Sequence, residues 1–421
     1  MLTNEKLNTI ATKLSPERPI RSEQLLKGRE RELVDIEREL RHFHTIPFIY
    51  GDRGVGKTSL ARTAAQIASN SDREHIYIPC APGARMLHIF REIGEELLKQ
   101  IFQDSAFQSI CNKVEVELSL NPKIRSSFEK KAPKLDEFSD ANAAVRTLKQ
   151  LDNLLPLPDR TIIILDELEE LNDSDRTHLA YFIKQIGDQE FSIKFILVGI
   201  AENVHELIGI HHSVPRYVKE ISLLPLDAQY LIDIVENAAT SIDVHVPRDT
   251  LFRIATVGNG FPHFAHLIGK AILIEAIDSD SSEITTSIYK AGVTRAVNDS
   301  TQELRISYEA ATQRSADYFK HLVWALAHSD VVDIRIDEWL RLYSELAHTF
   351  HWHRAEEKKL RTAISNFSKE SCGEIVTNTP SRYGSSEKRY RYKRYTNTLM
   401  RGHVRLQAEN EGFTLGTQNF L

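Results

Sequence analysis

Residues 45–58 read Thr-Ile-Pro-Phe-Ile-Tyr-Gly-Asp-Arg-Gly-Val-Gly-Lys-Thr. An apolar run typical of a buried strand stops at Gly51, and the segment from Gly51 to Thr58 has the spacing G-x-x-x-x-G-K-T. Its glycines permit the tight turn in which backbone N–H groups converge on one anion. The following residues, Ser-Leu-Ala-Arg-Thr-Ala-Ala, favour a helix, and a helix N-terminus attracts phosphate. The stretch therefore predicts a strand, a phosphate-binding loop and a helix.

Each part of this loop has an expected task. Lys57 is expected to reach the β- and γ-phosphates of a nucleotide, and the Thr58 hydroxyl to ligate Mg²⁺. The alternative is a glycine-rich turn with a chance lysine that binds nothing. The strand pattern before the loop and the helix pattern after it favour a nucleotide site. The residues predicted to contact the nucleotide here are Gly51, Asp52, Arg53, Gly54, Val55, Gly56, Lys57, Thr58 and Ser59.

A second apolar run, residues 161–165, ends in two carboxylates, Asp166 and Glu167. Open α/β sheets bind their ligands at the carboxyl ends of the strands. Asp166 is predicted to hold the water shell of Mg²⁺ beside Thr58. Glu167 is predicted to be the general base that activates the attacking water, because a metal does not deprotonate the nucleophile unaided. An acidic helix cap is the alternative. Together the two motifs predict ATP and Mg²⁺ as cofactors, and ATP hydrolysis as the reaction.

The overall composition is that of a water-soluble globular protein. The chain has 421 residues, 41% hydrophobic and 27% charged, and its length predicts two to three domains. No run approaches the length of a membrane span and no signal-peptide pattern opens the chain, so we expect a cytoplasmic protein. The net charge of −6 argues against a globally basic nucleic-acid binder but allows a local basic surface. The cysteines are interpreted as reduced thiols, since Cys80, Cys111 and Cys372 lack metal-site spacing.

Strand and helix patterns alternate around both motifs. A strand at residues 75–80 is followed by an amphipathic helix pattern, and strands are predicted again at 191–199 and 218–224. Such alternation predicts an α/β fold, a parallel sheet with helices on both faces. Residues 112–130 break the rhythm, because apolar and polar residues alternate there around Asn121-Pro122. They are interpreted as an inserted β-hairpin.

The segment before the first motif, Gly28-Arg29-Glu30, opens a helix pattern that leads into the phosphate loop. This order resembles AAA+ P-loop ATPases of the origin-recognition and cell-division-control initiator branch, and is also similar to transposition-targeting AAA+ ATPases. The resemblance implies a base with a parallel sheet, an α-helical lid and a C-terminal winged helix. It implies that Gly28 and Arg29 pack over the adenine, and that the inserted hairpin touches a substrate. A polar helix start and a cover for the sheet edge are the respective alternatives.

Three further positions are matched to the family. Asn203 resembles the residue that senses the γ-phosphate, although Glu202 intervenes; the alternative is a helix cap. Arg216 matches an arginine that reaches the γ-phosphate of a neighbouring subunit, or is a surface residue. His263 stands where the lid usually places a basic residue over the nucleotide. Because histidine is mostly neutral at pH 7, slow hydrolysis is expected.

The C-terminal region predicts three helices and a β-hairpin, the pattern of a winged helix. Between residues 382 and 405, Lys and Arg far outnumber the one acid, Glu387, and tyrosines interleave with them. Such a segment is typical of a wing that contacts phosphates. Basic residues can also keep a strand edge soluble, and winged helices can bind proteins. The residues predicted to bind nucleic acid are Lys388, Arg389, Arg391, Lys393 and Arg394.

The sequence thus predicts an AAA+ ATPase that couples ATP to homo-oligomer assembly and to action on DNA. The second hypothesis is an ATP-driven signalling switch that assembles with a protein effector, as in bacterial antiviral defence. The basic wing favours the first hypothesis, and the overall acidity and imperfect sensors favour the second. The predicted domains are an N-terminal arm (1–27), the ATPase base with its hairpin insertion near 112–130 (28–225), the helical lid (226–304) and the winged helix (305–421).

Overall fold

The computed structural model divides into two compact units. The sheet unit comprises Ile20–Asp52 and Lys57–Leu224, and the helical unit comprises Met1–Pro19, Arg53–Gly56 and Pro225–Leu421. Each unit is described by itself. The described residues are 3–17, 19, 25–42, 45–69, 75–103, 141–153, 161–189, 191–201, 214–314, 316–379 and 392–416. The hairpin predicted near residues 112–130 lies outside them, and the predicted domain bounds stay predictions.

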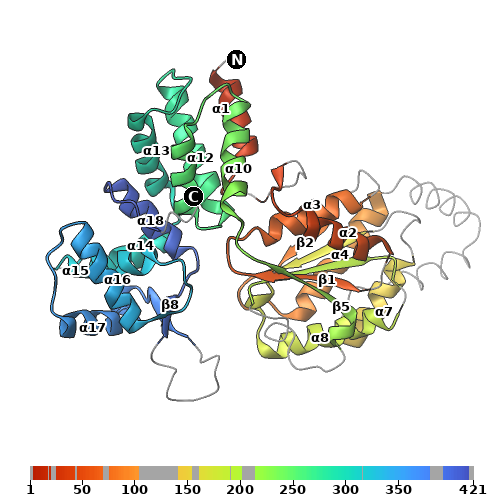
Figure 1. Ribbon diagram of the computed structural model, residues 1–421. Helices are drawn as coiled ribbons and strands as arrows, with labels where there is room; N and C mark the ends of the chain where they lie inside the picture. The colour runs from red at the N-terminus through yellow and green to blue at the C-terminus, as the bar shows by residue number, and fades with distance from the viewer. Residues whose placement is uncertain are drawn as a thin grey trace, which may run out of the picture. The chain divides into compact units, whose positions relative to one another are not determined.

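The sheet unit is built on a five-stranded sheet in the order β2-β3-β4-β1-β5, with neighbouring strands parallel throughout (Figure 1). Every residue of β3 is buried. A parallel strand covered on both faces must be apolar along its whole length, which explains the uninterrupted run before Asp166. The strands are β1 (Ile46–Gly51), β2 (Ile76–Pro79), β3 (Ile162–Asp166), β4 (Lys194–Gly199) and β5 (Val218–Leu223).

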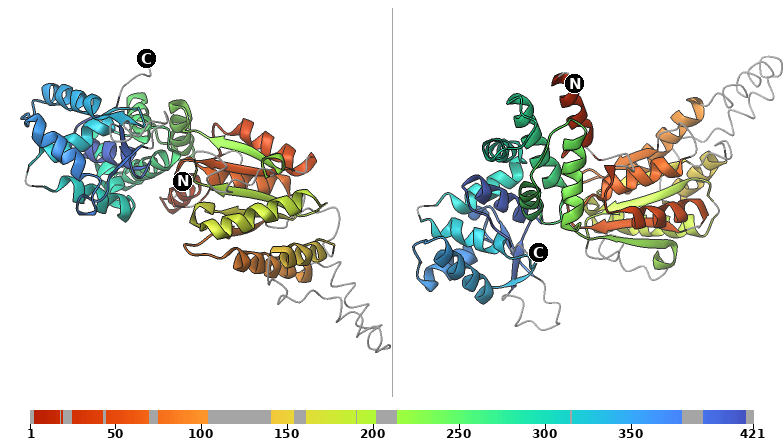
Figure 2. Two further views of the ribbon diagram at one scale, coloured as in Figure 1. Left: turned by 90° about the horizontal axis from the view of Figure 1, so that it is seen from below. Right: turned by 45° about the horizontal axis from the view of Figure 1, so that its top comes forward.

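Helices lie on both faces of this sheet (Figures 1 and 2). Helices α2 and α3 pack on each other and against β1, while α4, α7 and α8 pack together. The core under the second group includes an edge-to-face pair, Phe182 and Phe195, with ring centroids 5.4 Å apart. The helices are α2 (Glu30–His42), α3 (Lys57–Ala68), α4 (Met86–Gln103), α7 (Ala141–Asp152) and α8 (Asp173–Gly187), with short 3₁₀ turns η3 (Leu168–Glu170) and η4 (Val214–Tyr217). The α/β prediction is confirmed.

The helical unit begins with a helical layer. Residues of the predicted N-terminal arm form α1, and its Ile10 is buried where α1 packs against α10 and α12. Between α11 and α12 the chain turns sharply at Gly260, whose φ is +82°. A Cβ on Gly260 would lie 2.9 Å from the Leu226 carbonyl oxygen, so glycine is required. The helices are α1 (Thr3–Lys13), α10 (Ala228–Thr240), α11 (Arg248–Gly258), α12 (Pro262–Asp278) and α13 (Thr286–Asp299).

The rest of the helical unit has the arrangement of a winged helix, as predicted: a helical group beside a small antiparallel sheet in the order β6-β8-β7. Trp339 is fully buried there, and its indole N–H donates to the Leu322 carbonyl at 2.7 Å. The elements are α14 (Gln302–Thr312), α15 (Tyr318–His328), β6 (Ile334–Arg335), α16 (Ile336–Thr349), α17 (Glu357–Asn366), η5 (Glu370–Cys372), β7 (Val376–Asn378), β8 (Tyr392–Tyr395) and α18 (Met400–Asn410). Among the described helices, none has the length and apolarity needed to cross a bilayer.

Candidate nucleotide site

The phosphate-loop motif connects the carboxyl end of β1 to the N-terminus of α3. Gly51, Gly54 and Gly56 have φ values of +146°, +84° and +99°. These lie in the region that L side chains avoid, so the three glycines fit the motif for a conformational reason. At Gly51 space is also short, because a Cβ would lie 2.4 Å from the Leu223 carbonyl oxygen of β5. A Cβ on Gly56 would meet nothing within 4 Å.

Lys57 is the first residue of α3 and is 8% exposed. Its ammonium donates to the Gly51 carbonyl at 3.1 Å and to the Asp52 carbonyl at 2.7 Å. A phosphate oxygen is a stronger acceptor for an ammonium than a neutral carbonyl is, because both groups are then charged. A buried cation at a helix N-terminus therefore suits a phosphate. Ser59 is half-buried one residue after Thr58, and Val55 is fully buried.

Thr58 and Asp166, 108 residues apart in the chain, lie side by side: the threonine hydroxyl donates to Asp166 Oδ2 at 2.6 Å. Asp166 ends β3 and is 3% exposed. Its other oxygen, Oδ1, accepts the Glu167 N–H at 2.8 Å. One hydroxyl and one carboxylate are hard oxygen donors of the kind that Mg²⁺ takes alongside water and phosphate. The donor set fits the ion that the sequence predicts.

Glu167 turns the chain abruptly after β3. It adopts the left-handed conformation, with φ 59° and ψ 41°, and its side chain is exposed. A non-glycine residue there costs about 1–2 kcal/mol, so the surrounding structure must hold it. Adjacent carboxylates are thus separated in environment, one buried beside Thr58 and one open to solvent. This separation suits the two tasks predicted for Asp166 and Glu167.

Glu169 follows the acidic strand end in sequence and lies in the 3₁₀ turn η3. It is half-buried, and its Oε2 accepts the N–H of Ile200 at 2.8 Å. Ile200 directly follows β4, at the start of the segment that carries Asn203. Glu169 therefore ties the turn after β3 to the turn after β4. Asn203 itself lies outside the described residues.

Arg29, which the resemblance places over the adenine, makes contacts within the sheet unit. It is 5% exposed, and its guanidinium donates to the Leu224 carbonyl at 2.6 Å and pairs with Glu32 at 3.3 Å. These contacts link the start of α2 to the residue after β5. The guanidinium is thus used inside the protein, while Gly28 turns the chain before α2 with φ +69°.

The remaining nucleotide-related positions lie as follows. Arg216 on η4 is exposed; its guanidinium covers the Tyr217 ring at 4.5 Å and lies 3.7 Å from Asp188. His263 is half-buried in the first turn of α12, and burial lowers its pKa despite a hydrogen bond to the Pro16 carbonyl. Arg53 is exposed and pairs with Glu303 at 3.2 Å, a surface contact that contributes little.

The described part of the basic C-terminal run is largely internal. Lys393 is 6% exposed and its ammonium donates to Ser368 Oγ at 3.1 Å. This residue does not lie on the surface as a phosphate contact would, because strand residues alternate faces and β8 turns Lys393 inward. Arg394, its neighbour, is half-buried. Lys388, Arg389 and Arg391 lie outside the described residues.

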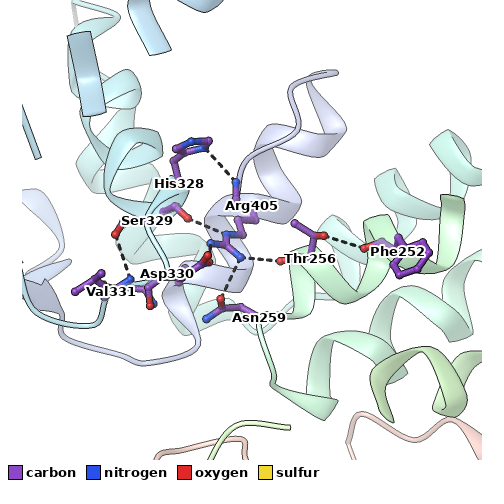
Figure 3. A network of polar contacts seen from close by, with 11 residues as sticks. Phe252, Thr256, Asn259, His328, Ser329, Asp330, Val331 and Arg405 are labelled. Atoms are coloured by element: carbon purple, nitrogen blue, oxygen red, sulfur yellow. Dashed lines mark hydrogen bonds and ion pairs between the residues drawn. The ribbon is translucent and has the colours of Figure 1, made fainter. Parts of the chain in front are cut away.

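Arg401 and Arg405 on α18, which end that run, are buried as well. The Arg405 guanidinium is surrounded by acceptors: the Ala327 and Thr256 carbonyls, both at 2.8 Å, Asn259 Oδ1 at 3.1 Å and Asp330 Oδ1 at 2.6 Å (Figure 3). Arg401 donates to the carbonyls of Asp330 and Val331. Both guanidinium groups are thus buried inside the helical unit, where Arg405 also pairs with the Asp330 carboxylate, and neither adds to a basic surface.

Two residues beside Asp166 are absent from the sequence-based set. The Tyr77 hydroxyl donates to Asp166 Oδ2 at 3.0 Å, and the Arg62 guanidinium lies 3.7 Å from the centre of the Tyr77 ring. In the sequence Tyr77 is one apolar-flanked residue of a short strand pattern, and Arg62 one cation in a helix. Only the pairing of β2 with β3 brings Tyr77 to Asp166, and α3 places Arg62 over its ring.

Part of the chain matches a known protein family. Residues 25–196 match the AAA ATPase domain family, so the chain contains an AAA ATPase domain. Over 92% of this chain and 99% of the other, the structure is similar to a Walker-type ATPase of Pyrococcus abyssi, with a TM-score of 0.51 and 17% identity. This likeness shows that the shared fold extends through the C-terminal region.

Two further structures are similar at lower scores. The ORC1 protein of Aeropyrum pernix, solved in complex with DNA, matches with a TM-score of 0.46 and 15% identity over 96% of each chain. Cdc6p of Pyrobaculum aerophilum matches with a TM-score of 0.46 and 16% identity over 95% of this chain and 98% of that one. No curated protein matches the sequence.

Proposed function

We propose that the protein binds Mg·ATP at the loop between β1 and α3 and hydrolyses it slowly. The observation that carries this proposal is the 2.6 Å contact between Thr58 Oγ1 and Asp166 Oδ2. It brings the last residue of the first motif to the acid of the second, beside the buried Lys57 ammonium. Both motifs then serve one ligand, a nucleotide triphosphate with its metal ion.

Each residue has a defined task in this proposal. When the nucleotide binds, the Lys57 ammonium donates to phosphate oxygens in place of the loop carbonyls and stabilises their negative charge. Thr58 and Asp166 hold the Mg²⁺, which neutralises phosphate charge when bound. Glu167, whose carboxylate is exposed to solvent, accepts the proton of the attacking water. The backbone strain at Glu167 fixes where that carboxylate projects.

The expected slowness follows from the states of His263 and Arg216, the two side chains that would stabilise transferred charge. The His263 imidazole is neutral at pH 7, since burial lowers its pKa. Arg216 is engaged with Asp188 and Tyr217 on its own surface. These surface partners are weak and could be exchanged for a γ-phosphate. We therefore propose that ATP promotes assembly of a homo-oligomer, in which Arg216 of one subunit reaches the site of the next.

Two substitutions test the catalytic proposal. Lys57→Ala should abolish binding of a fluorescent ATP analogue. Glu167→Gln should keep that binding and lower phosphate release by at least roughly 100-fold, the usual worth of a general base. Glu170→Gln is the matched control: this exposed acid lies in the same turn and should turn over ATP normally. Normal turnover by Glu167→Gln would refute the base assignment.

Action on DNA is the proposed output. It depends on Lys388, Arg389, Arg391 and Arg394, since Lys393 is buried. If these side chains contact phosphates, the affinity for duplex DNA falls steeply with salt. Removing their charges together should flatten the dependence of DNA affinity on salt. The matched control is Lys358→Ala on α17, which removes an exposed cation outside the wing and should leave that dependence unchanged.

A second candidate is favoured by the burial of Lys393, Arg401 and Arg405. Because these three charges are internal, they add nothing to a basic surface. An ATP-driven switch that recruits a protein effector needs no such surface. DNA binding that is weak at low salt and unchanged by the wing substitutions, combined with an ATP-dependent rise in particle mass, would favour this candidate over the first.

A further inference from the structure

Tyr77 reaches the predicted metal-binding acid from a neighbouring strand. Its residue in register on β3 is Ile164, while Asp166 lies opposite Pro79. Two residues along a strand span about 7 Å, so only a long side chain with a terminal donor covers the distance. The tyrosine hydroxyl does so and donates to Asp166 Oδ2 at 3.0 Å.

The direction of the Tyr77 side chain follows from the strand. Ile76 and Ile78, its neighbours on β2, are buried in the core cluster that includes residues of α4 and α8. Because successive strand residues alternate faces, Tyr77 points to the opposite face. There the Arg62 guanidinium of α3 lies 3.7 Å from the ring centre, a cation–π contact that restrains the ring.

Among the described residues, the three donors to the Asp166 carboxylate are not equivalent. The Glu167 N–H fixes Oδ1 through the backbone, at 2.8 Å. Thr58 and Tyr77 both donate to Oδ2, at 2.6 and 3.0 Å. Thr58 belongs to the proposed metal site itself. Tyr77 is thus the side chain outside the two motifs that sets the orientation of Oδ2.

We propose that Tyr77 is a positioning residue, which holds Asp166 in the orientation required for Mg²⁺ and is itself held by Arg62. The inference rests on the proposed Mg·ATP site. Residues that orient a metal ligand typically change metal affinity by about 10–100-fold when removed. Arg62 follows Thr58 by one helical turn, so α3 carries both the proposed metal-ligating hydroxyl and the clamp on the positioning ring.

The test measures how strongly Mg²⁺ and nucleotide favour each other's binding. The dissociation constant of a fluorescent, non-hydrolysable ATP analogue is measured in saturating Mg²⁺ and again in EDTA. For Tyr77→Phe we expect the dissociation constant in EDTA divided by that in Mg²⁺ to fall roughly 10-fold relative to the unsubstituted protein, with the value in EDTA unchanged. Arg62→Met, which keeps the hydroxyl but frees the ring, should shift the ratio in the same direction by less.

Tyr181→Phe is the matched control. It removes a hydroxyl of the same unit that bonds Asn142 and Gln185, away from Asp166. Its ratio should not change. If Tyr77→Phe lowers only the melting temperature and keeps the ratio, Tyr77 merely fills space and the inference is wrong. If the unsubstituted protein binds no nucleotide, the proposed function fails first, so the two failures are distinguishable.

Discussion

Arg405→Met should destabilise the helical unit by about 3 kcal/mol. The methionine keeps much of the apolar stem and removes the guanidinium, which is 2% exposed. Two of its acceptors, Asn259 and Asp330, are partly exposed side chains that can turn to water. The other two, the carbonyls of Ala327 and Thr256, belong to buried residues in the last turns of α15 and α11.

Those two carbonyls determine the magnitude. Last-turn carbonyls have no partner within their own helix, and Arg405 supplies one to each helix. A buried acceptor left unpaired costs about 1–3 kcal/mol, so two cost roughly 2–6 kcal/mol. Loss of a cation at the negative ends of two helices adds to this destabilisation. Since Asp330 regains water, we take about 3 kcal/mol as the expected loss.

Differential scanning calorimetry should resolve this change as a fall of roughly 6–12 °C in the transition of the helical unit. The sheet-unit transition should stay in place. The contrasting variant is Arg394→Met on β8, which should leave both transitions unchanged and weaken any DNA binding. Equal melting temperatures for Arg405→Met and the unsubstituted protein would refute the capping argument. Loss of DNA affinity in Arg405→Met without destabilisation would show that this arginine acts at the surface after all.

Three further outcomes are expected. Acidification from pH 7 to 5 should destabilise the helical unit, because burial lowers the pKa of His266 and of His403 to about 4. The unfolded chain protonates first, below about 6.5, so stability is lost as pH falls through that value, by at most about 1.4 kcal/mol per pH unit per histidine. If the melting temperature of a His403→Gln variant depends on pH as steeply as that of the unsubstituted protein, this prediction is wrong. Glu169→Ala should slow ATP turnover but keep nucleotide binding, because it frees the Ile200 turn; unchanged phosphate release would count against the link. Gly56→Ala should weaken ATP binding through backbone strain of roughly 1–2 kcal/mol, and titration of the fluorescent analogue checks this.

The ATPase base could be predicted from the sequence because the residues of each of its motifs follow one another in a fixed order along the chain. A buried strand, three glycines and Lys57 must follow one another for a phosphate loop to form, and they do. The acidic strand end could likewise be assigned before its partner was seen. That Thr58 and Asp166 come within 2.6 Å is the part that only the strand order β2-β3-β4-β1-β5 supplies.

Counting charges along the chain did not predict which basic residues lie on the surface, because that depends on the direction of each side chain. Lys393 and Arg394 are adjacent and equally basic in the sequence, yet β8 buries the first. Arg405 looked like part of the same basic run, but α18 turns it toward two helix ends. Tyr77 and Arg62 gave no signal because each acts through a residue distant in sequence. The sequence shows which residue types are present, whereas the roles of these residues depend on the face of the strand or helix that each occupies.

Helix α18 has a consequence for how this chain can be divided. Besides Arg405, it carries Glu409, a buried acid that accepts the Tyr289 hydroxyl of α13 at 3.2 Å and pairs with Arg253 of α11. Helix α18 therefore completes buried polar contacts of α11 and α13. Cutting the chain near residue 304 would strand buried polar groups on both fragments. Recombination could therefore replace the C-terminal region only together with matching changes to the residues of α11 and α13 that contact α18.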